Sequence, residues 1–247
     1  RLNTSSLQAR GLMGWWPLGA QTLFPSVSDG VVLDKSLYGR NGNIFWNESN
    51  ASTVTRGHRR GLWCKDDGAS SPKVNVHGIQ SPHVGYDLYG GSRPWISADG
   101  EGFAICAWTY VETMPSNTHQ GLWFQKNTGG GPIIGATRYN NDLWVRLRND
   151  AATEQYPAGG LLTFTAENVF SLDTWAHVIF GREINGEGYA FVNGERYTTG
   201  DTCEGPITNM NYDAYIGYGN PSAVQPWDGV LDDVRFYNRP LTTAEAQ

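Results

Sequence analysis

The chain has 247 residues, enough for one large hydrophobic core, and its 10 Trp and 12 Tyr residues exclude a disordered polymer. Its net charge is −6 and its longest basic run is His58-Arg59-Arg60, so binding to nucleic-acid phosphates is not expected. No apolar segment approaches the roughly 18–20 residues of a membrane-spanning helix. Charged residues make up only 17% of the chain, which suits neutral partners such as sugars but also any extracellular β protein.

Short apolar or alternating runs, separated by Gly, Asn, Asp and Pro, recur along the chain, and regular spacing of this kind predicts an all-β sandwich. The expected strands are Leu12–Leu18, Asn43–Trp46, Phe103–Val111, Leu122–Lys126, Ile133–Arg138, Leu143–Arg148, Leu161–Phe164, Ala176–Arg182, Tyr189–Val192, Arg196–Thr198, Ala214–Tyr218 and Val230–Tyr237. Residues 48–60 and 72–99 are polar or weakly patterned, and we expect long surface loops there. Since no linker or repeat interrupts the pattern, residues 1–247 are expected to form one domain.

One hairpin is specified by its turn. Asn193-Gly194 supplies the two positive-φ positions of a type I′ turn between Tyr189–Val192 and Arg196–Thr198. With Ala176–Arg182 upstream, these strands predict a three-stranded meander. A short helical turn is expected at the end of the chain, where Thr242 and Glu245 have the spacing of a capping box.

Two strands have faces of different character. In Leu143–Arg148 the positions expected to face the core are aliphatic, and the outward positions are Trp144, Arg146 and Arg148. In Phe103–Val111 one face is mostly aliphatic, and the other ends in Trp108 and Tyr110.

The three cysteines, Cys64, Cys106 and Cys203, do not make a disulfide framework because their number is odd. Cys106 lies in a strand and is expected to be a small buried hydrophobe. A Cys64–Cys203 bridge stays open, and no Cys/His spacing predicts zinc.

Four segments together resemble the laminin-G-like jelly-roll domains of the concanavalin A-like lectin/glucanase superfamily. They are the opening strand Gly14-Trp15-Trp16-Pro17-Leu18, the D-x-S-x-x-G-x-x-G loop from Asp34 to Gly42, the meander containing Trp175-Ala176-His177-Val178 and Ala190 to Glu195, and the closing stretch from Trp227 to Leu241. The resemblance implies a two-sheet antiparallel jelly-roll sandwich whose first and last strands are adjacent. It also implies a protein of the extracellular space, a cell surface or a virion surface. Segment Leu7–Trp16 is more loosely similar to laminin-G-like proteins of bacteriophages and environmental bacteria.

Many domains of this kind carry a structural calcium ion, and this chain has candidate ligands. Ca²⁺ prefers six to eight oxygen ligands, which Asp34 and Asn41 in the D-x-S loop can begin to supply. Strand alternation places Asp232 on the same face as Val230, Val234 and Phe236, where a carboxylate is costly unless it is paired or metal-bound. We therefore expect Ca²⁺ to join Asp34 and Asp232. The alternative is that Asp232 accepts backbone N–H bonds or pairs with an arginine such as Arg235.

Domains of this kind mostly bind glycans or proteins, and the outward aromatics are the candidate glycan ligands. Aromatic rings stack on sugar faces while arginine and amide groups bind hydroxyls. The expected platform consists of Trp144, Arg146, Arg148, Trp123, Gln125 and Trp108. The alternatives are that long loops cover these residues or that they form a contact between proteins.

Catalysis is not expected. A glycosidase needs two carboxylates on one face, and the E-x-D-x-E pattern of glucanases with this fold is absent. Asp232 and Asp233 are adjacent and point to opposite faces. A lyase cluster of Gln125, His177, Arg146 and Tyr139 has no recognisable motif, and His177 is expected to be structural.

Three hypotheses of function follow. The first is a non-catalytic, lectin-like carbohydrate-binding or adhesion module that binds a glycan or surface polysaccharide. The second is a structural decoration or fibre protein of a bacteriophage virion or cell surface, which would contact itself or other surface proteins. The third is a polysaccharide lyase or glycosidase.

Overall fold

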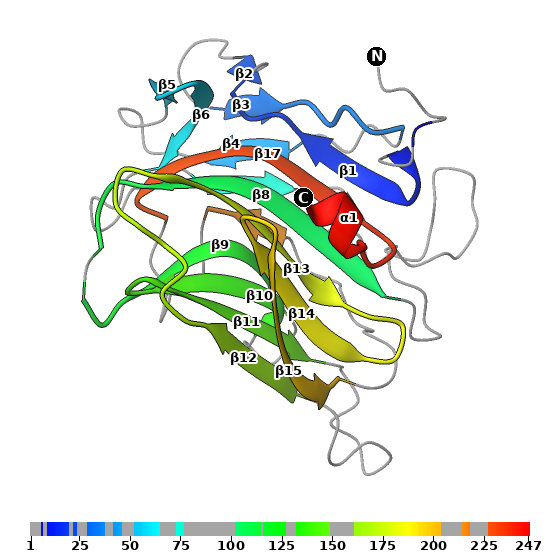
Figure 1. Cartoon of the computed structure of the whole chain (residues 1–247). Coiled ribbons are helices and arrows are strands. Elements are labelled where there is room, and N and C mark those ends of the chain that lie inside the picture. The colour runs from blue at the N-terminus through cyan, green and yellow to red at the C-terminus, as the bar shows by residue number, and fades with distance from the viewer. Residues whose placement is uncertain are drawn as a thin grey trace.

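The computed structural model describes residues 6, 9–19, 22–23, 29–37, 42–45, 52–64, 73–76, 102–114, 116–126, 132–148, 161–203, 214–217 and 227–247. These residues form mostly β-strands in two antiparallel sheets, with the helix α1 (Thr243–Ala246) near the C-terminus (Figure 1). No helix in the described part of the chain is long and apolar enough to cross a membrane. The expected jelly-roll sandwich is confirmed.

Sheet A contains the meander and the first and last described strands of the chain. Its described strands run in the order β15 (Glu195–Thr202), β14 (Glu187–Val192), β13 (Trp175–Arg182), β8 (Phe103–Val111), β17 (Gly229–Tyr237), β6 (Arg59–Cys64) and β5 (Ser52–Arg56). In addition, β1 (Leu12–Trp16) pairs antiparallel with β17, so the first and last of the expected strands are adjacent, as the resemblance implied.

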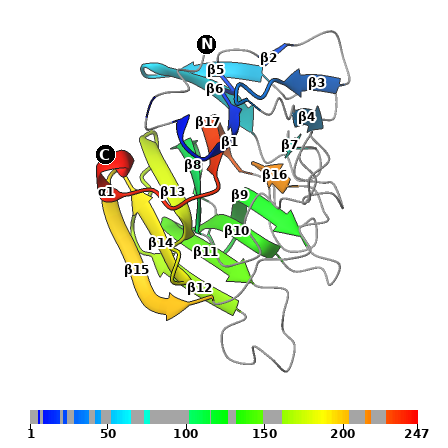
Figure 2. The same cartoon turned by 90° about the vertical axis from the view of Figure 1, so that its right-hand side faces the viewer.

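Sheet B forms the other layer. Its described strands run in the order β12 (Leu161–Ala166), β11 (Asp142–Arg148), β10 (Pro132–Tyr139), β9 (His119–Lys126), β16 (Ala214–Ile216), β7 (Lys73–Val76), β4 (Gly42–Phe45), β3 (Asp29–Val32) and β2 (Thr22–Leu23). In Figure 2, β13–β15 and β9–β12 lie on opposite sides of the sandwich. Each sheet therefore has an inner face toward the other sheet and an outer face.

The main core lies between the inner faces. Trp16, Trp123 and Phe236 are at most 1% exposed and form part of it. Their rings pack together, with centroids 6.4 Å apart for Trp16–Trp123 and 6.1 Å apart for Trp123–Phe236. The alternation expected in β8 is confirmed, since Phe103 and its aliphatic partners join this core while Cys106 faces outward.

The meander and its turn are confirmed. Strand β13 pairs with β14, and β14 pairs with β15, all antiparallel. Asn193 and Gly194 have φ values of 52° and 84°, as a type I′ turn requires.

A second apolar cluster covers the outer face of sheet A, where α1 lies against it (Figure 2). The expected capping box is present: the Thr242 side chain accepts from the Glu245 N–H, and the Glu245 carboxylate accepts from the Thr242 N–H. Arg239 Nη2 also lies 2.6 Å from Glu245 Oε1. These contacts hold the C-terminal residues against Cys106 and the other members of the outer apolar cluster.

The cysteines are free and buried, so the open Cys64–Cys203 bridge is not formed. Cys106 is the small buried hydrophobe that its strand predicted, and burial raises its pKa to about 12. At neutral pH the Cys106 thiol is therefore uncharged and unreactive.

Two loop predictions need correction. The hairpin β5–β6 lies largely within residues 48–60, which were expected to be a surface loop, and it turns at Gly57, whose φ is 56°. The segment was misread because β5, Ser-Thr-Val-Thr-Arg, pairs at the edge of sheet A and needs no regular apolar face. In the 72–99 segment, Lys73–Val76 forms β7, and residues 77–99 lie outside the described part.

Candidate functional site

The outer face of sheet B presents the outward residues of β11. Leu143, Val145 and Leu147 are fully buried in the core, and the residues between them are half-buried. The predicted outward direction of Trp144, Arg146 and Arg148 is thus confirmed.

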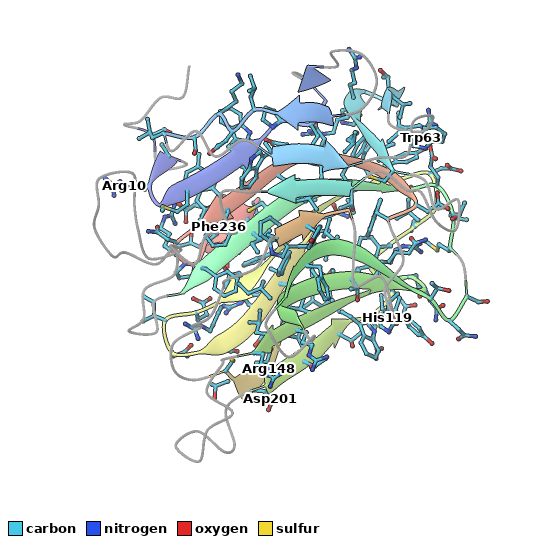
Figure 3. All side chains as sticks on the ribbon, turned by 180° about the vertical axis from the view of Figure 1, so that it is seen from behind. Arg10, Trp63, His119, Arg148, Asp201 and Phe236 are labelled. Carbon is cyan, nitrogen blue, oxygen red and sulfur yellow. The ribbon has the colours of Figure 1, made fainter. Side chains whose placement is uncertain are left out.

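Three aromatic rings from neighbouring strands, including that of Trp144, lie close together on this face. The His119 ring on β9 lies 4.6 Å from the Tyr139 ring on β10 and 4.9 Å from the Trp144 ring, centroid to centroid. Tyr139 and Trp144 are 5.5 Å apart. We call the surface formed by His119, Tyr139, Trp144, Arg146 and Arg148 the Trp144 face; Figure 3 shows His119 and Arg148 among the strands β9–β12.

Hydrogen bonds hold two of these rings in place. The Tyr139 hydroxyl donates to Asn117 Oδ1 at 3.1 Å, and His119 Nδ1 lies 3.1 Å from Thr137 Oγ1. Burial lowers the pKa of His119, so this ring is neutral at pH 7. The positive charge of the face therefore comes from its arginines.

Sequence reasoning missed His119 and placed Tyr139 only in a hypothetical lyase cluster. Strand β10 brings the three rings together because it lies between β9 and β11. It pairs with β9 through Tyr139↔His119 and with β11 through Thr137↔Trp144. Outward alternation along β10 would have identified Tyr139. His119 becomes a neighbour only through the strand pairing.

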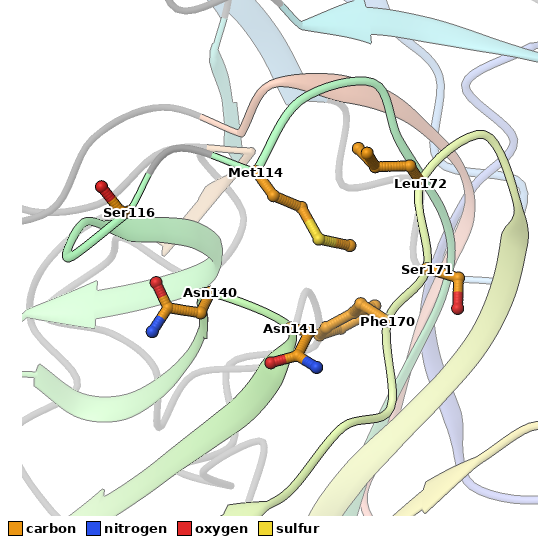
Figure 4. A pocket seen from close by; sticks show the side chains of 7 residues that line it. All are labelled: Met114, Ser116, Asn140, Asn141, Phe170, Ser171 and Leu172. Atoms are coloured by element: carbon orange, nitrogen blue, oxygen red, sulfur yellow. The ribbon is translucent and has the colours of Figure 1, made fainter.

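A hollow of about 370 Å³ opens beside this face, where the turn after β10 meets the segment that follows β12. Figure 4 shows Met114, Phe170 and Leu172 around its middle and Asn140 and Asn141 along its edge. Asn140 directly follows Tyr139 of the Trp144 face, and its Oδ1 accepts from the Asn117 N–H at 3.1 Å. The hollow and the Trp144 face are therefore neighbours.

Three members of the expected platform do not join the Trp144 face. Trp123 is 1% exposed and belongs to the core, because an irregularity in the β9–β10 register puts both Leu122 and Trp123 on the inner side. Trp108 is in β8, on the outer face of sheet A. Gln125 pairs through its backbone with Ile134, and its side chain lies outside the described residues.

The alternation expected around Asp232 is also wrong. The β8–β17 register shifts between Asp232 and Arg235, and Asp233 has a φ of 51°. This bulge resets the alternation, so Val234 and Phe236 face the core while Asp232 does not.

The carboxylates expected to bind calcium have protein partners. Asp34 Oδ1 accepts from the backbone N–H groups of Trp15 and Ser36, at 2.8 and 2.7 Å. Asp232 accepts from the Gly19 N–H at 3.0 Å and forms an ion pair with Arg59 at 3.2 Å. Asp232 thus has the partners named in the alternative interpretation, a backbone N–H and an arginine.

The described residues include no group of three or more Asp, Glu, His or Cys side chains suited to a metal. Asn41 lies outside them. Calcium binding by Asp34, Asn41 and Asp232 stays a prediction.

His177 lies on the outer face of sheet A, whereas Arg146 lies on the outer face of sheet B. The two side chains are therefore not brought together in a lyase-like cluster. Its ring stacks on Trp108 with centroids 4.8 Å apart, and the Arg59 guanidinium lies 3.8 Å above the same indole. Burial, followed by the charges of Arg235 and Arg59, lowers the pKa of His177 to about 4. It is neutral and packed, consistent with the structural role expected for it.

We expect His177 to make the protein less stable in mild acid. In the unfolded chain its pKa is about 6.5, so between about pH 6.5 and 4 the unfolded state binds the extra proton and stability falls as pH falls. The His177→Phe variant keeps a ring on Trp108 and cannot titrate. Thermal melts at pH 7.5 and 5 should show a smaller drop for this variant than for wild type; equal drops would contradict the prediction.

The family model described as the concanavalin A-like lectin/glucanases superfamily matches residues 89–247. No curated protein matches the chain significantly. Among solved structures, domain 4 of AbnA, an extracellular GH43 arabinanase from Geobacillus stearothermophilus crystallised with arabinotriose, is 14% identical, with a TM-score of 0.61 and coverage of 95% of this chain and 96% of that one.

The receptor-binding domain of botulinum neurotoxin C/D mosaic serotype is 12% identical (TM-score 0.59; 95% of this chain, 49% of that one). The binding domain of Paraclostridial Mosquitocidal Protein 1 is 15% identical (TM-score 0.62; 96% and 51%). The chain thus spans about half the length of these two binding domains, and the likeness concerns the fold. Together with the two-sheet sandwich, the match over residues 89–247 shows that the chain belongs to the concanavalin A-like lectin/glucanase superfamily.

Proposed function

We propose that this protein is a non-catalytic carbohydrate-binding module that holds its glycan on the Trp144 face. The observation that carries the proposal is the meeting of His119, Tyr139 and Trp144 on three neighbouring strands. Sugar rings have an apolar C–H face that packs on aromatic rings, and their hydroxyls bind polar groups at the edge. Arg146 and Arg148 supply such groups along the same strand.

The comparisons support a binding role in general terms. Binding domains occur among the similar structures, and domain 4 of the arabinanase was crystallised with a sugar ligand. The extracellular setting of that arabinanase agrees with the proposed location of this chain outside the cell or on a cell or virion surface.

The carboxylates on β11 and β17 support binding over hydrolysis. Of the outward positions of β11, only Asp142 carries a carboxylate, and its Oδ1 accepts from the Asn168 N–H at 2.8 Å. Asp232 and Asp233 on β17 are paired with Arg59 and Arg235. A glycosidase instead needs two carboxylates about 5–10 Å apart that flank the bond to be cleaved.

Replacing Trp144 with alanine should weaken glycan binding at least about 5-fold, because one ring of a stacking platform contributes roughly 1 kcal/mol or more. Ligands would first be identified on a glycan array, and the two affinities then compared by isothermal titration calorimetry. Trp108→Ala is the matched control, since Trp108 is also half-buried but lies on the outer face of sheet A. Thermal melts would show that both variants fold.

Equal losses in the two variants would place the site elsewhere. A folded wild-type protein that binds no glycan on the array would overturn the proposal. If light scattering then showed stable oligomers, the assembly hypothesis would replace it.

A further inference from the structure

Arg146 and Arg148 are two partly exposed arginines for which the described part of the chain supplies no ion pair. Ion pairs join arginines to carboxylates in five places: Arg56–Glu112, Arg59–Asp232, Arg196–Glu183, Arg235–Asp233 and Arg239–Glu245. Within the described part of the chain, neither Arg146 nor Arg148 has a carboxylate within 4.0 Å, although both are partly exposed beside an aromatic cluster.

The neighbouring strands offer these two arginines no negative charge. Arg146 lies between Gly135 on β10 and Thr163 on β12, and Arg148 is opposite Leu161. The nearest carboxylate on the same face of β11 is Asp142, four residues from Arg146. That is about 13 Å along a strand, more than the Debye length of about 8 Å at physiological salt. Among the described residues, the Trp144 face therefore carries a local positive charge, on a protein whose net charge is −6.

The donors that the Trp144 face can offer a ligand are the terminal guanidinium N–H groups of the partly exposed Arg146 and Arg148. Trp144 Nε1 and Arg146 Nε also have no hydrogen-bond partner, but they are buried. Indole and guanidinium groups donate and cannot accept. An acceptor-rich, negatively charged group is the chemical complement of such a surface, and arginine binds carboxylates and sulfates through paired, charge-assisted hydrogen bonds.

We propose that the ligand of this face is an acidic glycan, a chain that carries carboxylate or sulfate groups; this inference rests on the proposed carbohydrate-binding function. One sugar ring stacks on Trp144, and an acidic group on another unit of the chain binds Arg146 and Arg148. Outward side chains on a strand repeat about every 6.6 Å. The ligand is therefore at least a disaccharide, because the acidic group lies one or two outward positions from the stacked ring.

The test compares acidic sugars with uncharged partners of the same backbone. The probes are trigalacturonic acid and its methyl ester, and a sulfated galactan oligosaccharide and its desulfated form. By isothermal titration calorimetry in 50 mM NaCl, at least one acidic probe should bind about 10-fold or more tightly than its neutral partner. The preference should shrink in 300 mM NaCl, as expected for a partly exposed charge pair. The pair that shows it distinguishes carboxylate from sulfate.

Arg146→Gln and Arg148→Gln should remove this preference, because each should weaken binding of the acidic probe far more than binding of its neutral partner. Arg146→Lys keeps the charge and should retain part of the preference. Arg196→Gln is the control, because Arg196 is an exposed arginine on β15 of sheet A. Thermal melts of each variant would check folding, and the lysine variant keeps the test valid if the glutamine variant is unstable.

Two failures can be told apart. If wild type binds acidic and neutral probes equally and Trp144→Ala weakens both, the acidic-glycan inference is wrong and the proposed function stands. If neither these probes nor the glycan array shows binding, the proposed function itself fails. Loss of the acidic preference in Arg196→Gln to the same degree would also overturn the assignment to Arg146 and Arg148.

Discussion

Replacing Trp123 with alanine is expected to lower the free energy of unfolding by about 3–5 kcal/mol, the usual cost of truncating a buried aromatic side chain. Trp123 is 1% exposed and packs against both Trp16 and Phe236 between the sheets. Because Trp123 Nε1 has no hydrogen-bond partner, the loss comes from packing alone. The cavity left in a close-packed core cannot fully collapse.

Urea denaturation of wild type and variant measures this effect directly. Trp144→Ala is the matched control, since Trp144 is half-buried on the outer face and should lose distinctly less stability. The two substitutions should therefore have different effects: Trp123→Ala is expected to lower stability, and Trp144→Ala is expected mainly to weaken glycan binding. A Trp123→Ala protein within about 1 kcal/mol of wild type would show that this side chain is not in the core.

Replacing Arg138 with methionine is expected to destabilise the protein by about 3 kcal/mol or more. Arg138 is 1% exposed, and its guanidinium donates to the carbonyls of Asn140 and Thr113, both at 2.7 Å, and to Gln120 Oε1. Methionine fills similar space but removes all three hydrogen bonds. A hydrogen bond from a charged donor contributes about 1.5–3 kcal/mol. Burial lowers the pKa of Arg138 to about 10, which keeps it charged at pH 7.

The same variant should also weaken glycan binding. Arg138 hydrogen-bonds to the carbonyls of Thr113, which precedes β9, and of Asn140, which directly follows Tyr139 of the Trp144 face. It thereby joins two segments next to the proposed site. Denaturation and calorimetry would measure the two effects, with Arg196→Gln as a surface control expected to change stability by less than about 1 kcal/mol. Arg138→Lys restores the charge but not the planar set of donors, so its stability should be intermediate. If Arg138→Met were as stable as the control, the buried hydrogen bonds would contribute little.

Local chemistry was readable from the sequence wherever a few neighbouring residues decide the outcome. Asn193-Gly194 predicted a type I′ turn, because this turn needs a positive φ at both central positions and few residue types other than Asn and Gly adopt it readily. The spacing of Thr242 and Glu245 predicted the cap of α1. Regular alternation in β11 predicted that Trp144, Arg146 and Arg148 face outward, since side chains on a regular strand alternate strictly.

Tertiary structure decided the positions where a strand departs from regular alternation or gains neighbours from distant segments. The bulge at Asp233 turned Asp232 away from the core, and the irregular β9–β10 pairing turned Trp123 into it. A single extra residue reverses every later side chain, and nothing in the local sequence marks where it will occur. The sequence by itself therefore determined the sandwich, its turns and one line of outward residues. Only the pairing of β9, β10 and β11 brought His119 and Tyr139 to Trp144, because register between strands depends on contacts along the whole sheet.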